Sequence, residues 1–387
     1  MFVRQRTLWR IIKKKEKSIA IFELFMSYLY LYSVIVLSYE EYIGEMKFTR
    51  SSIKQLIVVV LEMLITIKYA ISSKFDMKGD IFLAFGKYKY LFNIVYSIWF
   101  TWLLYYRFMI IMKERQQKLH FIWLFKSFNK GKGKIILSEY CLNKSLFRKF
   151  KTLAVAVLCM AEITYQYLNI SALIIFFTLI FEFNRLEGIT FLDCIITNFF
   201  IVLWFLQLLF CIGSLIYGLF YLLIVNEFFV FRTKYINMKL ESLLRRKTSD
   251  KTMLKVLKSF DKVLVDIFKY SETLKYMLFL IYTFFPIIHF LTFTGFITTN
   301  SIGKLWKFCA VISFSLCLIV NLSFARIYEK VHRTLVRIKI IYFAIKYSVN
   351  SQHGIFTHSH FVNHLDGIQK ERFCFVILNK ETKLFYL

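Results

Sequence analysis

Hydrophobic residues in this chain come in long runs, and basic residues fill most of the segments between them. A helix needs about 20 mostly apolar residues to cross roughly 30 Å of hydrocarbon. Seven runs approach or exceed that length: 18–38, 55–73, 88–112, 152–183, 191–231, 272–299 and 305–327. This pattern predicts an all-α fold, a multi-span transmembrane helical bundle in which 191–231 continues as helix beyond the membrane.

The charges between the runs predict which ends face the cytosol. Residues 1–17 hold seven Lys and Arg and one acid, 113–151 hold eleven and two, and 232–271 hold eleven and four. The other connections are short or nearly balanced in charge. Because Lys and Arg collect on the cytosolic side of membrane proteins, the head, both basic loops and the tail are predicted to be cytosolic. The chain is thus expected to be a multi-pass membrane protein with a cytosolic N-terminus.

Three runs lie between the cytosolic head and the cytosolic loop 113–151, where an even number of crossings is required. Run 18–38 is interrupted by Glu23 and diluted by Ser and Tyr, so we expect it to lie in the interface or to pack against the bundle. Six crossings remain. The expected single polytopic domain, 1–387, comprises a cytosolic head (1–17), an interfacial or first apolar segment (18–38), the transmembrane bundle (55–327) and a cytosolic tail (328–387).

Two cytosolic segments have the periodicity of amphipathic helices. In 251–270 apolar residues recur at helical spacing opposite several lysines, after the start signal Ser249-Asp250. The stretch that follows residue 327 repeats the pattern. Such helices either form a packed cytosolic layer, which we favour, or lie on anionic lipid.

Composition narrows the class of protein further. The chain is 58% hydrophobic with a net charge of +28, which excludes disordered and disulfide-scaffold classes. Topology explains the basic loops better than nucleic acid does. The crowded His353, His358, His360 and His364 fit no zinc spacing. We expect no metal, no cofactor and no enzymatic activity.

A stretch near the C-terminus carries a resemblance to a known family. It reads Phe373-Cys374-Phe375-Val376-Ile377-Leu378-Asn379-Lys380-Glu381-Thr382-Lys383-Leu384-Phe385. This stretch and the layout of the chain resemble the insect gustatory receptor family. The shared layout consists of the basic head, the long first basic loop after a Trp- and Tyr-rich run, and the long apolar segment that leads into an amphipathic loop. In that family an apolar run ends in Leu-Asn or Leu-Asp and is followed by Leu-Phe at the start of the last transmembrane helix.

The resemblance implies a ligand-gated cation channel of the plasma membrane, assembled as a homo- or hetero-oligomer with other gustatory receptor subunits. Its implied partners are a small-molecule tastant and membrane lipids. In the family, a last helix with a Thr-Tyr and a Gln-Phe signature follows and lines the pore. This sequence ends at Leu387, so the resemblance implies conduction compromised by a missing pore helix.

Two other classes remain open on the sequence. A seven-transmembrane G-protein-coupled receptor with an extracellular N-terminus would use all seven runs and would still place both basic loops inside. Against it stand the basic head and the lack of an Asp-Arg-Tyr-like triplet. A transporter or membrane enzyme is the third possibility, which the single Pro286 and twelve Gly support only thinly.

Six polar or aromatic residues fall near or within the outer half of the expected bundle, where a pocket could bind a small tastant. Glu162, near the middle of its run, is a further intramembrane polar residue. The alternative for each is an interhelical hydrogen bond or a place in the headgroup belt. The six ligand-binding candidates are Tyr167, Asp193, Asn198, His289, Thr292 and Trp306.

Overall fold

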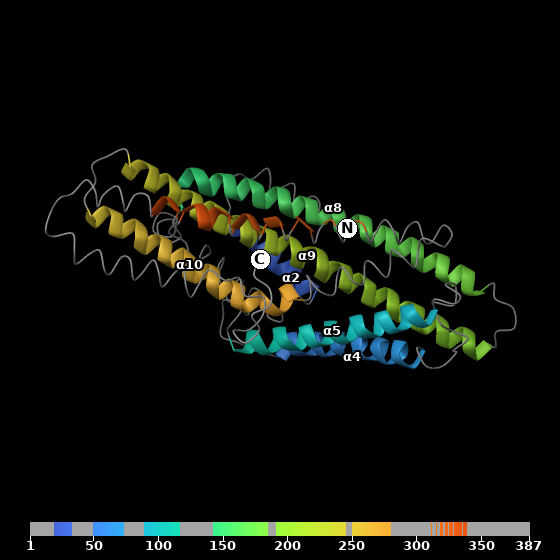
Figure 1. Ribbon diagram of the computed structural model, residues 1–387. Helices are drawn as coiled ribbons and strands as arrows, with labels where there is room; N and C mark the ends of the chain where they lie inside the picture. The colour runs from blue at the N-terminus through green and yellow to red at the C-terminus, as the bar shows by residue number, and fades with distance from the viewer. Residues whose placement is uncertain are drawn as a thin grey trace. The chain divides into compact units, whose positions relative to one another are not determined.

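The computed structural model describes residues 19–32, 49–72, 89–116, 142–184, 191–244 and 250–279, together with residues scattered between 311 and 338. The helices are α2 (Ile19–Leu31), α4 (Thr49–Ser72), α5 (Lys89–Arg115), α8 (Lys144–Asn184), α9 (Phe191–Leu244) and α10 (Asp250–Phe279) (Figure 1). The described residues between 311 and 338 are also helical. No strand occurs in these ranges, which confirms the all-α prediction for the described part of the chain.

Five of the predicted apolar runs coincide with helices, in chain order α2, α4, α5, α8 and α9. The prediction that run 191–231 continues as helix is confirmed, because α9 extends to Leu244. The amphipathic segment 251–270 is helical too, and α10 carries it without a break to Phe279. The run 272–299 beyond Phe279 lies outside the described residues, and the run 305–327 is described only in part.

By length and composition, two helical stretches in the described ranges could each cross a membrane. They are Lys144–Ile174 in α8 and Cys194–Leu243 in α9. Helix α8 begins well before its apolar run, because Asn143 caps it: the Asn143 Oδ1 atom accepts a 2.7 Å hydrogen bond from the backbone N–H of Leu146. The cap draws the basic residues 144–151 into the first two turns of the helix.

The chain folds into two compact units. Unit 1 consists of 1–118, 153–222 and 280–320, and unit 2 consists of 119–152, 223–279 and 321–387. Unit 2 therefore contains most of both basic loops and the whole tail. Its segments hold 30 Lys and Arg against 11 Asp and Glu, so +19 of the net charge of +28 belongs to unit 2.

In unit 1, α4 and α5 form an antiparallel pair (Figure 1). Glu62 of α4 lies against Arg107 of α5, whereas Tyr69, farther along α4, stacks at 5.7 Å on Phe100, which comes earlier in α5. At the end of α4 the Asn93 amide of α5 donates a 3.3 Å hydrogen bond to the Ser72 carbonyl. In these contacts the residue number rises along α4 as it falls along α5, so the two helices run in opposite directions.

Helices α4 and α8 each run antiparallel to α9 within unit 1. Gln207 of α9 binds Glu62 of α4, and the Lys68 ammonium lies 5.9 Å from the ring centre of Phe200, earlier in α9. Along α8 the ring of Tyr165 meets Tyr217 at 5.5 Å, and that of Phe176 meets Phe205 at 4.5 Å. The four helices α4, α5, α8 and α9 thus alternate in direction along the chain.

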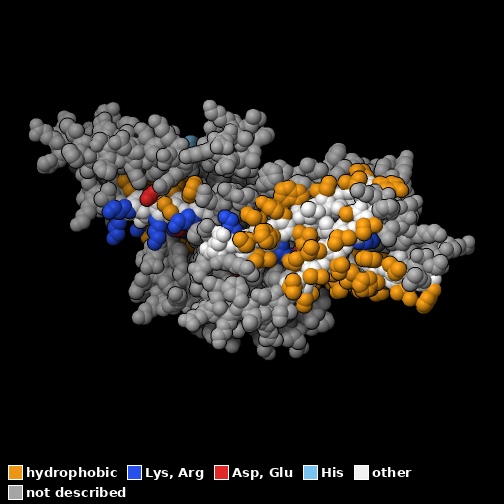
Figure 2. Space-filling model, turned by 90° about the horizontal axis from the view of Figure 1, so that it is seen from below, with side chains coloured by type: hydrophobic (Ala, Val, Ile, Leu, Met, Phe, Trp, Pro, Cys, Tyr) orange, Lys and Arg blue, Asp and Glu red, His pale blue; other side chains and the backbone are white. Residues whose placement is uncertain are grey.

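The surface of unit 1 is apolar and its interior holds polar groups. Figure 2 shows apolar side chains covering the face formed by α4 and α5. Exposed apolar residues follow helical stripes, as in α5 at Leu91, Ile94, Ile98, Tyr105, Phe108 and Met112, and in α8 at Met160, Ile163, Tyr167, Ile170, Ile174, Phe177 and Phe181. Buried polar residues of the same unit are Glu62, Lys68, Ser72, Asn93, Arg107, Glu114, Ser171, Thr197 and Gln207. A water-soluble domain has a mostly polar surface and few buried ionisable side chains, so unit 1 differs from it on both counts.

Helix α9 changes its surroundings along its length. Phe191, Ile195, Phe199, Val202 and Leu206 are exposed, whereas every residue from 216 to 230 is buried except the half-buried Leu223. A helix that is apolar all round packs inside protein. The length of the run 191–231 is therefore explained by an exposed apolar stretch followed by a protein-enclosed one.

Unit 2 packs around the second part of α9. Tyr270 of α10 contacts Phe229 at 5.4 Å and Phe150 of α8 contacts Phe228 at 5.4 Å, while Phe260 and Val263 are fully buried. The described helical residues between 323 and 337 run parallel to α9, since in the hydrogen-bonded pairs the residue number rises along both segments together. These pairs are Asn226–Ser323, Glu227–Arg326, Asn237–Thr334 and Glu241–Arg337.

Candidate functional site

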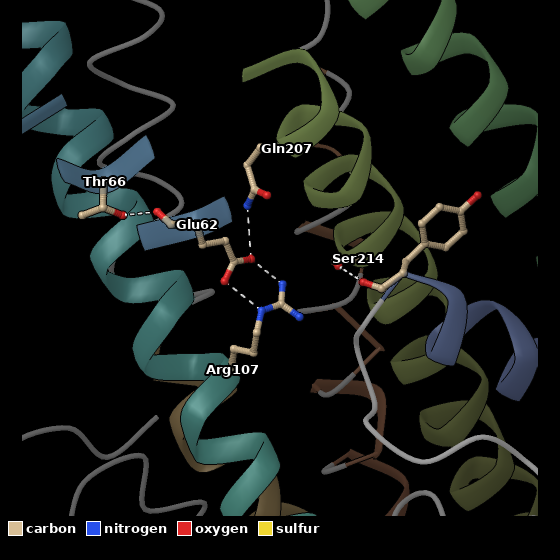
Figure 3. Close-up of polar contacts among 6 residues, drawn as sticks. Glu62, Thr66, Arg107, Gln207 and Ser214 are labelled. Atoms are coloured by element: carbon tan, nitrogen blue, oxygen red, sulfur yellow. Dashed lines mark hydrogen bonds and ion pairs between the residues drawn. The ribbon is translucent and has the colours of Figure 1, made fainter. Parts of the chain in front are cut away.

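A buried ion pair joins three helices of unit 1. The Arg107 guanidinium of α5 binds both carboxylate oxygens of Glu62 on α4: its Nε donates to Oε2 at 2.8 Å and an Nη group donates to Oε1. The Gln207 amide of α9 donates a third bond, 3.1 Å, to Oε1 (Figure 3). Glu62 and Gln207 are fully buried and Arg107 is 7% exposed.

The chemistry of this cluster follows from the residue types. A guanidinium presents a rigid fork of N–H donors that matches the two oxygens of a carboxylate, so one pair supplies two charge-assisted bonds. Two buried ions are tolerated only when each is paired and hydrogen-bonded. The cluster therefore fixes the register of α4, α5 and α9, and any relative movement of these helices has to break it.

A second cluster in unit 1 joins α2, α8 and α9 through tyrosines. The Tyr217 ring of α9 stacks between Tyr28 and Tyr32 of α2, at 4.5 Å and 5.1 Å between ring centres. The Tyr217 hydroxyl donates a 2.5 Å hydrogen bond to the Glu162 carboxylate of α8, and the Gln166 amide donates to the same carboxylate at 3.2 Å. Tyr217 is fully buried, whereas Glu162 is half-buried.

The end of α2 is held by two further features of α9. The Ser214 hydroxyl donates a 2.5 Å hydrogen bond to the carbonyl oxygen of Tyr32 (Figure 3), a group that the helix end leaves without an intrahelical partner. At Gly213 a Cβ atom would overlap three carbon atoms of the Tyr32 ring. Only glycine lets the ring approach the α9 backbone this closely.

The structure places the six predicted ligand-binding residues only in part. Tyr167 lies on the exposed face of α8, and the Asn198 amide contacts the Cys194 Sγ atom at 3.4 Å, one turn earlier on α9. Asp193 lies in the first turn of α9, and its side chain is outside the description. His289, Thr292 and Trp306 lie outside the described residues. The pocket built from these six residues stays a prediction.

Sequence reasoning missed most members of the two clusters. It noted Glu162 as an intramembrane polar residue, but it did not single out Arg107, Gln207 or Tyr217. The available signal was an acid, Glu62, inside one apolar run and a base, Arg107, deep inside the next, because ions at membrane depth pair with one another. A glutamine and a tyrosine in an apolar run give no comparable signal.

Within the described ranges no three His, Cys, Asp or Glu side chains gather as metal ligands would. Among the described residues, Cys159 and Cys194 are not joined in disulfides.

No protein-family model, no curated protein and no solved structure matches this chain.

Proposed function

We propose that this protein is a multi-pass plasma-membrane chemoreceptor of the gustatory type, with its head, basic loops and tail in the cytosol. Its membrane part is unit 1, and the observation that carries the proposal is the apolar surface of that unit around buried ionisable side chains. Leu, Ile, Phe and Met side chains face outward in stripes, while the Arg107–Glu62 pair and the amides of Asn93 and Gln207 are buried. Lipid is the solvent that favours this distribution.

The directions of the helices support the same reading. Consecutive crossings must alternate in direction, and α4, α5, α8 and α9 do so in chain order. The ionised side chains in α4 and α5 are compatible with crossings, because Glu62 and Arg107 are buried against each other. Charged residues within membrane spans characteristically face the bundle interior and pair in this way.

The grouping of the basic segments supports the orientation. The loops and tail that the charge rule assigns to the cytosol belong to one compact unit, although they are far apart in the sequence. Segments of one compact unit are expected to lie on the same side of the membrane. The net charge of +19 in that unit makes the cytosolic side the favoured one.

The receptor function rests on the resemblance of the layout and of residues 373–385 to the gustatory family. A small tastant would act by binding one arrangement of the bundle more tightly than another. The Glu62–Arg107–Gln207 cluster couples three helices, so a ligand that shifts one of them would act on the other two. An oligomer with further gustatory subunits would convert this shift into cation conduction.

The test is expression of the full chain in oocytes, alone and together with gustatory receptor subunits, under a panel of sugars, bitter compounds and amino acids. A tastant-evoked cation current that requires this chain supports the proposal. A response that requires a heterotrimeric G protein, combined with antibody access to an N-terminal tag on intact cells, favours the G-protein-coupled alternative. Absence of the protein from the membrane fraction overturns both.

A further inference from the structure

Helix α2 runs in the same direction as α4, the next described helix in the chain. Phe25 contacts Tyr221 at 6.2 Å, Tyr28 stacks on Tyr217 and the Tyr32 carbonyl binds Ser214. The partners retreat along α9 as α2 advances, so α2 is antiparallel to α9. Since α4 is antiparallel to α9 as well, α2 and α4 are parallel to each other. Two consecutive crossings of a membrane cannot be parallel.

The depth of α2 agrees with its direction. It has 13 residues, about 20 Å of helix, which is shorter than the roughly 30 Å of hydrocarbon in a bilayer. Its last turn lies beside Gly213 and Ser214, whereas α9 begins at Phe191, about 33 Å farther along its axis. The α2 helix therefore reaches the middle of α9 and leaves the first half of α9 uncovered.

The contacts that hold α2 are specific. The Tyr217 ring lies between two α2 rings, and its hydroxyl is bound to Glu162 of α8, so the same side chain connects all three helices. The Ser214 hydroxyl caps the end of α2, and Gly213 provides the space for Tyr32. Sliding of α9 along α8 has to break the bond to Glu162 and withdraw Tyr217 from between the two rings.

We propose that α2 is a latch that does not cross the membrane: it lies on the side on which α4 begins and fastens α9 to α8 through the Tyr28–Tyr217–Tyr32 stack. The topological half of this proposal rests on the proposed membrane placement of unit 1. The latch itself rests only on the contacts among α2, α8 and α9. The two halves are tested separately.

Epitope tags on the full chain test the topology. One tag is placed before Met1, one between Ile43 and Gly44, and one between Met77 and Lys78 as a marker for the outer side. We expect the first two to bind antibody only after permeabilisation and the third to bind it on intact cells. A tag at 43/44 that binds on intact cells overturns the latch topology but leaves the bundle intact. A tag at 77/78 that stays hidden overturns the bundle instead.

Hydrogen–deuterium exchange of the full chain in nanodiscs tests the latch. Gly213→Ala should speed exchange of the α2 amides by at least about tenfold, because the added methyl displaces the Tyr32 ring. Tyr217→Phe keeps the ring stack and removes the bond to Glu162, so exchange should rise about threefold. Tyr105→Phe, which removes a hydroxyl from the exposed face of α5, is the control. Unchanged exchange of α2 in both latch variants overturns the proposal.

Discussion

The guanidinium of Arg107 donates hydrogen bonds from two nitrogens to the carboxylate of Glu62, although the residues are 45 positions apart and belong to different helices. Either residue alone would destabilise the fold, because an unpaired ion in an apolar interior carries a large free-energy cost. Their pairing makes α4 and α5 one rigid hairpin and ties it to α9 through Gln207.

Removing one partner of the pair should destabilise the protein strongly. Arg107→Ala leaves the buried Glu62 carboxylate without its counter-ion, and a loss of about 3–5 kcal/mol is expected. Thermal melting of the detergent-purified chain, followed by size-exclusion chromatography, measures the effect. The double variant Glu62→Gln/Arg107→Gln should melt higher than Arg107→Ala. A double variant that melts lower than Arg107→Ala would contradict the role of the pair.

Charges placed on the apolar stripes of unit 1 should block membrane insertion. Phe177→Lys and Ile98→Lys alter exposed residues, and a lysine near the bilayer centre costs about 2.5–3.5 kcal/mol of insertion free energy. Surface yield of the tagged chain should fall severalfold. The matched control is Phe268→Lys, at a residue of α10 in unit 2 that is as exposed as Ile98; this variant should change the yield little. Equal tolerance at all three positions would argue against a lipid-facing surface.

The stability of unit 2 should depend on the Asp266 carboxylate, which binds the buried Arg232. Asp266 accepts a 2.7 Å bond from Arg232, whose side chain is fully buried over Phe228 and Phe229. Asp266→Ala removes this partner and should lower stability by about 3 kcal/mol in the melting assay.

The exposed pair Arg337–Glu241 provides the comparison for Asp266→Ala. Glu241→Ala breaks an ion pair of the same type on the surface, where such pairs contribute about 0–1 kcal/mol. Similar melting temperatures for the two variants would show that burial does not decide the strength of the Arg232 contact.

The start of α8 should depend on its cap. Asn143→Ala removes the acceptor for the Leu146 N–H and should cost about 1 kcal/mol, whereas Asn143→Ser or Asn143→Asp keeps an acceptor and most of the stability. Exchange of the amides in the first turn of α8 is the local readout. Faster exchange in the Ser and Ala variants alike would show that the side-chain acceptor is not the stabilising group.

The sequence predicted where helices form because their apolar stretches are long and nearly uninterrupted. It anticipated α4, α5, α8 and α9 within a few residues at most ends, and it anticipated α10 from the spacing of its apolar positions. Helix α8 begins eight residues before its apolar run, because those eight residues are too basic to join such a run. A side-chain cap at Asn143 decides that boundary, and hydropathy does not report caps.

What the sequence by itself determined is the one-dimensional order of apolar and basic stretches, since each residue carries its own hydrophobicity and charge wherever it lies. The tertiary structure alone decided which side of each helix is buried, that Glu62 meets Arg107, and that Tyr217 lies between two rings of a helix nearly 200 residues earlier. It also decided the direction of α2. These relations depend on distances between segments remote in sequence, and such distances are set by packing of the whole chain rather than by the composition of any one segment.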